Sequence, residues 1–245
     1  VYEISNAGQL YWFAALVNGT LTDGTAQKGS AKAILVNDIT VNTGVLNADG
    51  TLASDVSGFK VWTPIGNDDN KYIGIFDGQH HTVSGLYFND SQTDYVGLFG
   101  YNKVTIKNVG VADSYFNGKN YVGGVCGYKE YGTISNCYNT GAVSGSGSVG
   151  GVCGYNNSGT ITNCYFDSTV YNGEAVGTNS DTVEKTEGKT TTQFASGEVA
   201  YLLSQGCTVG EGESAVTYSG SVWGQQLGTD DYPVLGGLPV YFRDE

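Results

Sequence analysis

The sequence predicts an all-β solenoid in which short strands stack in successive coils. The first observation is a pattern in the middle of the chain that recurs at a fixed interval, from Gly97 to Gly124 and again from Gly124 to Gly151. This period of about 27 residues lies within the range of roughly 20–50 that is typical of solenoids, propellers and arrays. The second observation is composition: of 245 residues 38 are Gly and only 3 are Pro, while Val, Thr, Tyr and Ile are plentiful. This composition favours strands joined by many tight turns.

Two blocks define the repeat. A glycine-bounded block recurs at equal intervals, as Gly97–Tyr101, Gly124–Tyr128 and Gly151–Tyr155. A second block follows each copy, as Thr105–Val109, Thr133–Cys137 and Thr160–Cys164. A diverged copy of both blocks lies at Gly74–Leu86, and an apolar strand at Ala33–Val36 precedes it. We therefore predict a solenoid over residues 31–167 with about five coils.

One asparagine recurs at an equivalent position of the second block, as Asn108, Asn136 and Asn163. Asparagines stacked in this way can donate hydrogen bonds from one rung to the next. We expect them to form a structural ladder at a corner of the solenoid.

An N-terminal cap is predicted over residues 1–30, with a helix at about residues 6–18. Ser5 or Asn6 can accept a hydrogen bond from a free N–H at the start of this helix, and Asn18-Gly19 suits its end. Apolar residues between these positions follow helical spacing: Leu10, Phe13, Leu16 and Val17. Such a helix would cover the first coil, whose strand edges are otherwise exposed.

A C-terminal cap is predicted over residues 168–245, where the repeat fades. A short amphipathic helix is expected within Thr191–Leu203, and short strands or a wrapping segment within Trp223–Leu235. The sequence leaves open whether the cap helices pack on the ends of the solenoid or along its side.

The five cysteines include two pairs at equivalent repeat positions, Cys126 with Cys153 and Cys137 with Cys164; the fifth is Cys207. Free cysteine behaves as a small buried hydrophobic residue, so we expect reduced thiols stacked inside the solenoid. Neighbouring rungs lie about 4.8 Å apart, which leaves a disulfide between equivalent positions open. No C-x-x-C motif occurs, so no zinc site is expected.

The chain carries 24 acidic and 11 basic residues, a formal net charge of -13. A nucleic acid would be repelled, so we expect no nucleic-acid partner. No apolar run approaches 18 residues, so no membrane span is expected. The sequence begins at Val1 rather than Met. We expect a mature or trimmed fragment that is a monomer or a segment of a larger protein.

The repeat resembles the GLUG motif, a short module of bacterial exported and surface proteins. The matching pieces are Val122–Tyr128 with Gly132–Tyr138, and Val149–Tyr155 with Gly159–Tyr165. The earlier copy at Val96–Val109 departs from the motif because it lacks the glycine before its Thr-Ile step. The resemblance implies a right-handed parallel β-helix-like solenoid that is secreted by a bacterium or displayed on its surface. It also implies a non-catalytic, adhesin-like role in binding a glycan or a surface protein.

Three tyrosines at one repeat position are the candidates for ligand binding: Tyr101, Tyr128 and Tyr155. They should stack along one edge of the solenoid. An exposed aromatic ladder offers a sugar ring or a protein partner rigid apolar area with a polar tip. The competing interpretation is that these rings only shield the strands beneath them.

The alternative function is that of a carbohydrate-active β-helix enzyme, either a polysaccharide lyase or a glycoside hydrolase. Asp77 with His80 or His81 would supply its acid–base pair, although a Phe-Asp-Gly turn also serves to turn the chain. Asp113 and Asp167 fall near coil corners, and nothing in the sequence pairs them for glycoside hydrolysis. We expect no enzyme activity, no catalytic residue, no metal and no cofactor.

Overall fold

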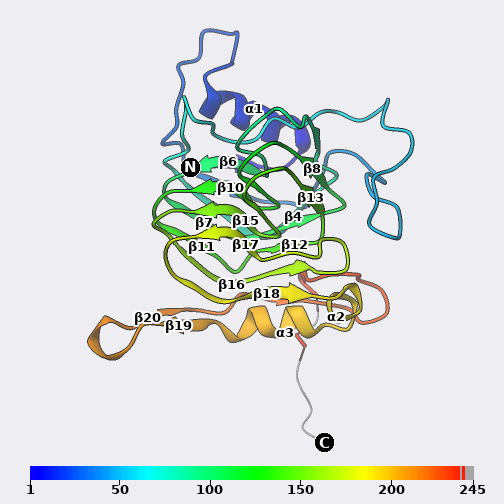
Figure 1. The fold of residues 1–245 in the computed structure, drawn as a ribbon, viewed down its shortest axis with the longest axis vertical. Coiled ribbons are helices and arrows are strands. Elements are labelled where there is room, and N and C mark those ends of the chain that lie inside the picture. The colour runs from blue at the N-terminus through cyan, green and yellow to red at the C-terminus, as the bar shows by residue number, and fades with distance from the viewer. Residues whose placement is uncertain (238, 241–245) are drawn as a thin grey trace, which may run out of the picture.

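The protein is a parallel β-solenoid of about seven turns, so the predicted fold class is confirmed (Figure 1). The computed structural model describes residues 1–237 and 239–240. The longest sheet runs the length of the solenoid through β1 (Tyr2–Ile4), β2 (Ala33–Leu35), β3 (Ile39–Thr40), β4 (Ile75–Ser84), β7 (Thr105–Ala112), β11 (Thr133–Ser135), β12 (Tyr138–Asn139), β16 (Thr160–Asp167) and β18 (Val183–Lys189).

Three smaller parallel sheets form the other sides of the coils. The largest contains β6 (Phe99–Asn102), β10 (Cys126–Lys129), β15 (Cys153–Asn156) and β17 (Val176–Asn179). The second contains β5 (Tyr87–Asn89), β8 (Tyr115–Asn117) and β13 (Ala142–Ser144), and the third β9 (Val122–Gly123) and β14 (Val149–Gly150). Equivalent repeat positions lie in register, so Ile134 pairs with both Ile106 and Ile161. All three isoleucines are fully buried inside the solenoid.

The asparagine ladder forms as expected, within the long sheet. Asn108, Asn136 and Asn163 have φ angles of 55°, 54° and 52°, a left-handed conformation that asparagine tolerates better than most residues. The Asn163 side chain donates to Asn136 Oδ1 over 2.8 Å, and Asn136 donates to Asn108 Oδ1 over 3.2 Å. Asn108 in turn donates to Asp77 Oδ1. The ladder therefore links four successive rungs.

The predicted N-terminal helix is present as α1 (Ala7–Asn18). The Asn6 side chain accepts from the backbone N–H of Gln9, and Gly19 ends the helix in a left-handed conformation. The apolar face of α1 is fully buried and continuous with the solenoid core. This helix therefore closes the first end of the solenoid (Figure 1). Strand β1 precedes it and adds a rung from within residues 1–30.

The C-terminal cap begins later than the sequence suggested, because β17 and β18 extend the solenoid beyond Asp167. The cap contains α2 (Thr191–Ala195) and α3 (Glu198–Gln205), where a short helix was predicted. An antiparallel hairpin follows, β19 (Cys207–Val209) and β20 (Val216–Tyr218), with the 3₁₀ turn η1 (Gly212–Ser214) between its strands. Strands β21 (Trp223–Gly224) and β22 (Val234–Leu235) pair in the tail. The predicted cap also includes residues 238 and 241–245, which lie outside the described residues.

The C-terminal cap has its own apolar cluster, separate from the core of the solenoid. Phe194, Val199, Leu203 and Trp223 pack there on two tyrosines that point outward from the long sheet, Tyr138 and Tyr165. The cap therefore covers the outer face of the last rungs as well as their end.

Candidate functional site: a tyrosine platform

The three predicted tyrosines lie side by side on the sheet that contains β6, β10 and β15. Tyr128 is paired in register with Tyr101 on one side and Tyr155 on the other. The ring centroids of Tyr128 and Tyr155 are 5.1 Å apart with an interplanar angle of 3°, and those of Tyr101 and Tyr128 are 4.7 Å apart. The parallel register thus produces the aromatic ladder that the repeat predicts.

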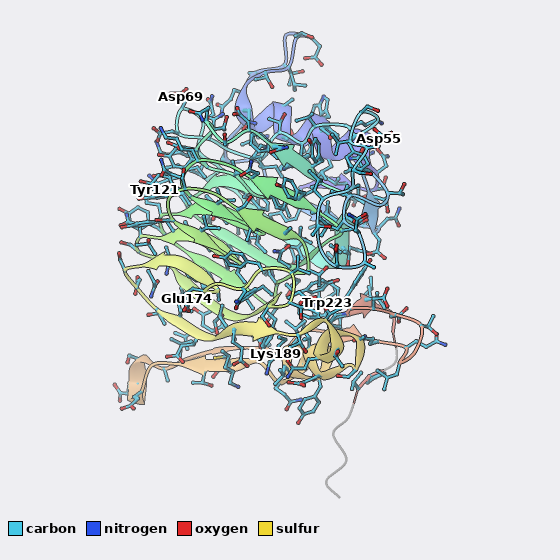
Figure 2. The ribbon with its side chains drawn as sticks, turned by 45° about the vertical axis from the view of Figure 1, so that its right-hand side comes forward. Asp55, Asp69, Tyr121, Glu174, Lys189 and Trp223 are labelled. Carbon is cyan, nitrogen blue, oxygen red and sulfur yellow. The ribbon has the colours of Figure 1, made fainter. Side chains whose placement is uncertain are left out.

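Two further tyrosines, Tyr95 and Tyr121, complete the surface, and the sequence reasoning missed them. Their rings stack on each other at 5.1 Å. Tyr121 meets the ring of Tyr128 edge-on at 5.2 Å and that of Tyr155 at 5.7 Å. Figure 2 shows Tyr121 at the outer edge of the solenoid. We call these two residues and the predicted three the tyrosine platform.

A signal for the second column was present in the sequence. Tyr95 and Tyr121 each directly precede the Val-Gly step that opens a repeat block, where the third copy has Ser148. Both adopt a left-handed backbone, with φ angles of 64° and 58°. The strict period hides the match, because these two tyrosines lie one position closer together than equivalent residues of the repeat.

The platform is unevenly exposed. Tyr101 is only 7% exposed, whereas Tyr121, Tyr128 and Tyr155 are half-buried. The Tyr101 hydroxyl donates to Glu130 Oε2 over 2.7 Å, and the Lys71 ammonium lies 4.9 Å from the centre of its ring. Tyr101 is therefore a fixed base, and the other rings provide the accessible surface.

The phenols of Tyr95, Tyr101 and Tyr128 stay neutral over the physiological pH range. Burial raises the pKa of Tyr95 to about 12, and it also raises the pKa of Tyr128. Burial together with the hydrogen bond to Glu130 raises the pKa of Tyr101. A ligand that contacts Tyr95 or Tyr128 would therefore meet an uncharged ring with a hydroxyl group that can donate and accept hydrogen bonds.

The structure does not join Asp77 to a histidine by a hydrogen bond. The Asp77 carboxylate accepts from the Gln79 backbone and from Asn108, and it forms an ion pair with Lys107 over 3.1 Å. His81 Nδ1 instead faces Asp38 Oδ1 at 3.1 Å. The other histidine, His80, packs edge-on against Trp223, and burial lowers its pKa. Asp77 and the two histidines, considered from the sequence as an acid–base pair, thus have different hydrogen-bond, ion-pair or ring partners.

Asp113 and Asp167 line one cavity of about 210 Å³ between the solenoid and the C-terminal cap. Asp113 accepts from the backbone N–H groups of Gly44 and Leu46 and so anchors a surface loop. Asp167 accepts from the Thr191 hydroxyl over 2.7 Å at the start of α2. Both carboxylates therefore hold chain segments in place.

Among the described residues, no group of three or more His, Cys, Asp or Glu side chains could hold a metal ion. Nor does that part of the chain contain a helix long and apolar enough to cross a membrane.

The geometry defines a parallel β-solenoid that carries an aromatic platform on one sheet. Within it, residues 118–144 and 145–171 match the GLUG motif, so the chain contains two copies of the motif that the sequence suggested. A 109-residue segment, 42% of this chain, is 36% identical to part of halomucin from Haloquadratum walsbyi. The matched part is 1% of the length of halomucin.

Among solved structures, a "putative immunoglobulin A1 protease" from Bacteroides ovatus aligns with 96% of this chain and 92% of its own. The sequence identity is 16% and the TM-score is 0.34. A likeness this weak carries no argument about this chain.

Proposed function

We propose that this chain is a non-catalytic, adhesin-like module of a secreted or cell-surface bacterial protein, and that the tyrosine platform binds its ligand. The GLUG motifs and the halomucin match support a surface-associated module. The observation that carries the binding proposal is the accessible stack of Tyr128 on Tyr155, with Tyr121 against both rings.

The platform suits the apolar face of a sugar ring. Its rings are held by neighbouring rungs and by one another, so little conformational entropy is lost when a ligand binds. Apart from the buried Tyr101, each ring also combines an apolar face with a hydroxyl group, which matches the mixed surface of a sugar. We therefore favour a glycan over a protein as the ligand.

The non-catalytic part of the proposal rests on the acidic residues. Asp77, Asp113 and Asp167 each accept structural hydrogen bonds, and Asp77 is also paired with a lysine. A general acid or nucleophile needs a carboxyl group that can reach the reacting atoms. Their present contacts favour a structural role.

A glycan array tests this function. The wild type is compared with the double variant Tyr128→Ala/Tyr155→Ala, and the matched control is Tyr115→Ala, which removes a half-buried stacked tyrosine from another sheet. We expect wild type and control to bind the same glycans and the double variant to lose at least about tenfold in affinity, which corresponds to about 1.4 kcal/mol. Equal binding by all three proteins, or binding by none, would remove the proposal.

A further inference from the structure

Four of the five cysteines form two stacks in the core, each made of two thiols on neighbouring rungs. Cys126 on β10 is paired in register with Cys153 on β15. Cys137 and Cys164 directly precede Tyr138 and Tyr165, which are also paired in register. All four side chains are 0% exposed. The thiols are free in this structure, as are all five described cysteines.

Each stack contains two cysteines and no third. The rung before Cys126 has Phe99 at this position, and the rung after Cys153 has Val176. In the other stack, the next rung after Cys164 has Thr186. A cysteine in either stack therefore has one in-register sulfur partner.

The spacing of the rungs suits a covalent bond within each stack. Adjacent strands lie about 4.8 Å apart, inside the range of about 4.4–6.8 Å found between the Cα atoms of disulfide-bonded cysteines. In-register side chains on parallel strands also point in the same direction. The thiol of Cys153 already interacts with that of Cys126, and the thiol of Cys164 with that of Cys137.

We propose that Cys126–Cys153 and Cys137–Cys164 form two disulfide bonds when the chain folds in an oxidising environment, and that these bonds staple the two GLUG coils to each other. The oxidant is a low-molecular-weight disulfide such as oxidised glutathione. One cysteine thiolate attacks it and releases one glutathione thiol. The second cysteine thiolate attacks the resulting mixed disulfide and releases the other glutathione thiol. Each new protein S–S bond thus reduces one glutathione disulfide to two thiols, which take up the two cysteine protons.

The bonds form during folding, because the finished solenoid seals the thiols. The thiolate is the attacking species, and burial raises the pKa of Cys153 and of Cys164. A small oxidant also cannot reach a side chain that has no exposed surface. Each bond closes the chain into a loop one coil long, since its two cysteines occupy equivalent positions of successive repeats. Closing such a loop restricts the unfolded chain and so stabilises the fold.

The test refolds the full chain from denaturant either in a glutathione redox buffer or in excess reductant. We expect the oxidatively refolded protein to be 4 Da lighter, two hydrogens for each of two disulfides. Alkylation under denaturing conditions should label one cysteine, Cys207, instead of five. We also expect a thermal midpoint about 5–10 °C higher than that of the reduced protein.

Two variants assign the bonds. Cys153→Ser should lose only 2 Da on oxidative refolding, because Cys137 and Cys164 still pair. The matched control Cys207→Ser should lose the full 4 Da. The proposal would be overturned if all five cysteines were alkylated after oxidative refolding, or if the oxidised and reduced proteins had equal thermal midpoints. Disulfide-linked peptides that join a cysteine of one stack to a cysteine of the other would also overturn it.

Discussion

Two tyrosine pairs, each made of equivalent residues from successive repeats, occupy different surroundings on the solenoid. Tyr128 and Tyr155 stack on the outer face of their sheet and stay partly accessible. Tyr138 and Tyr165 also point outward, from the long sheet, yet they are 0% and 2% exposed because the C-terminal cap covers them. The same residue, repeated at the same interval, therefore provides a candidate binding surface in one place and a docking surface for the chain itself in the other.

The difference shows what a repeat can and cannot reveal. The period places each tyrosine at one position of successive rungs and so predicts that the rings stack. Whether the stack remains accessible depends on Phe194, Leu203 and Trp223, which lie in the non-repetitive tail. Ligand binding is therefore proposed for Tyr128 and Tyr155. At Tyr138 and Tyr165 it is excluded as long as the C-terminal cap covers them.

The largest effect is expected when the buried pair is truncated. Tyr138 contacts Phe194 and Trp223, and its hydroxyl donates to the Pro233 carbonyl over 2.8 Å. Replacing it with alanine leaves a cavity beneath the cap, so we expect Tyr138→Ala to lower the free energy of unfolding by about 3–5 kcal/mol. Tyr128→Ala, on the accessible pair, should cost only about 1 kcal/mol. Urea unfolding of both variants would measure the contrast, and equal losses would contradict it.

A second prediction concerns the glycine beneath the buried pair. A Cβ atom added at Gly110 would lie 2.3 Å from Cζ of Tyr138, so the ring and the cap above it would have to shift. We expect Gly110→Ala to destabilise the fold by about 2 kcal/mol. Gly58→Ala is the matched control, because a Cβ there meets nothing within 4 Å. If both substitutions have the same effect on the urea midpoint, the close approach of Tyr138 is not important.

Much of the fold could be predicted because it follows from short-range patterns in the sequence. The N-terminal helix has a capping residue and helical apolar spacing, and the asparagine ladder recurs in every GLUG-like block. The last rung could not be predicted in this way. Strand β18 contains three charged residues that are exposed on its outer side, Glu184, Lys185 and Glu187. Only its pairing with β16 makes it a rung.

The candidate site was predicted in part, for a similar reason. The ladder of Tyr101, Tyr128 and Tyr155 follows from the strict repeat. Tyr95 and Tyr121 lie in turns whose length varies between coils, so a fixed period does not align them. The burial of Tyr101 was also not predictable, because it depends on contacts with Glu130 and Lys71 from other coils.

The third prediction separates stability from ligand binding at the accessible pair. Lys129 follows Tyr128 but points inward, is 0% exposed, and stands where the neighbouring rungs have Asn102 and Asn156. Its ammonium donates to Asn102 Oδ1 over 2.6 Å and to the Val104 carbonyl. Burial lowers the pKa of Lys129 from 10.5 to about 8.

The sign of the effect follows from that pKa. The unfolded chain binds the lysine proton more tightly than the folded chain, so burying the charged lysine lowers the free energy of unfolding. This destabilisation is fully present below pH 8 and falls as the pH rises toward 10.5. We expect the wild type to gain about 2 kcal/mol relative to Lys129→Asn between pH 7 and pH 10. Glycan binding at pH 7 should be the same for both proteins. If the free energies of unfolding of the wild type and Lys129→Asn changed with pH in the same way, the pKa of Lys129 would not be lowered in the folded protein.

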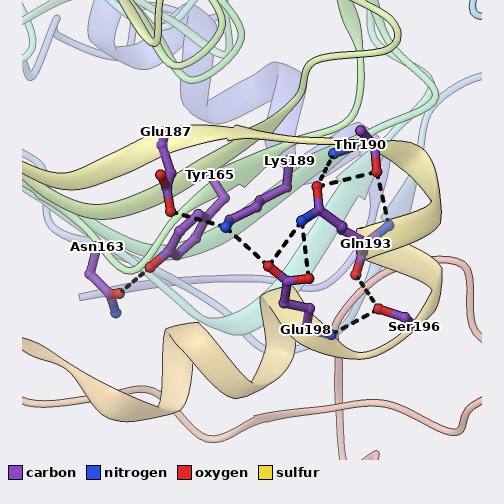
Figure 3. Close-up of polar contacts among 8 residues, drawn as sticks. All are labelled: Asn163, Tyr165, Glu187, Lys189, Thr190, Gln193, Ser196 and Glu198. Atoms are coloured by element: carbon purple, nitrogen blue, oxygen red, sulfur yellow. Dashed lines mark hydrogen bonds and ion pairs between the residues drawn. The ribbon is translucent and has the colours of Figure 1, made fainter.

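The smallest effect is expected at the polar attachment of the C-terminal cap (Figure 3). Lys189, at the end of β18, forms ion pairs with Glu187 over 3.1 Å and with Glu198 of α3 over 3.0 Å. Both acids are partly exposed, so water screens the pairs, and their contribution should stay near 1 kcal/mol or below. We therefore expect Lys189→Ala to speed hydrogen exchange in α3 by about fivefold or less, with little change in the rungs. The control is Lys119→Ala, an exposed lysine on a loop far from α3 along the chain. Exchange in α3 that rises as much as in Tyr138→Ala would mean that charge, rather than the buried tyrosine pair, holds the cap in place.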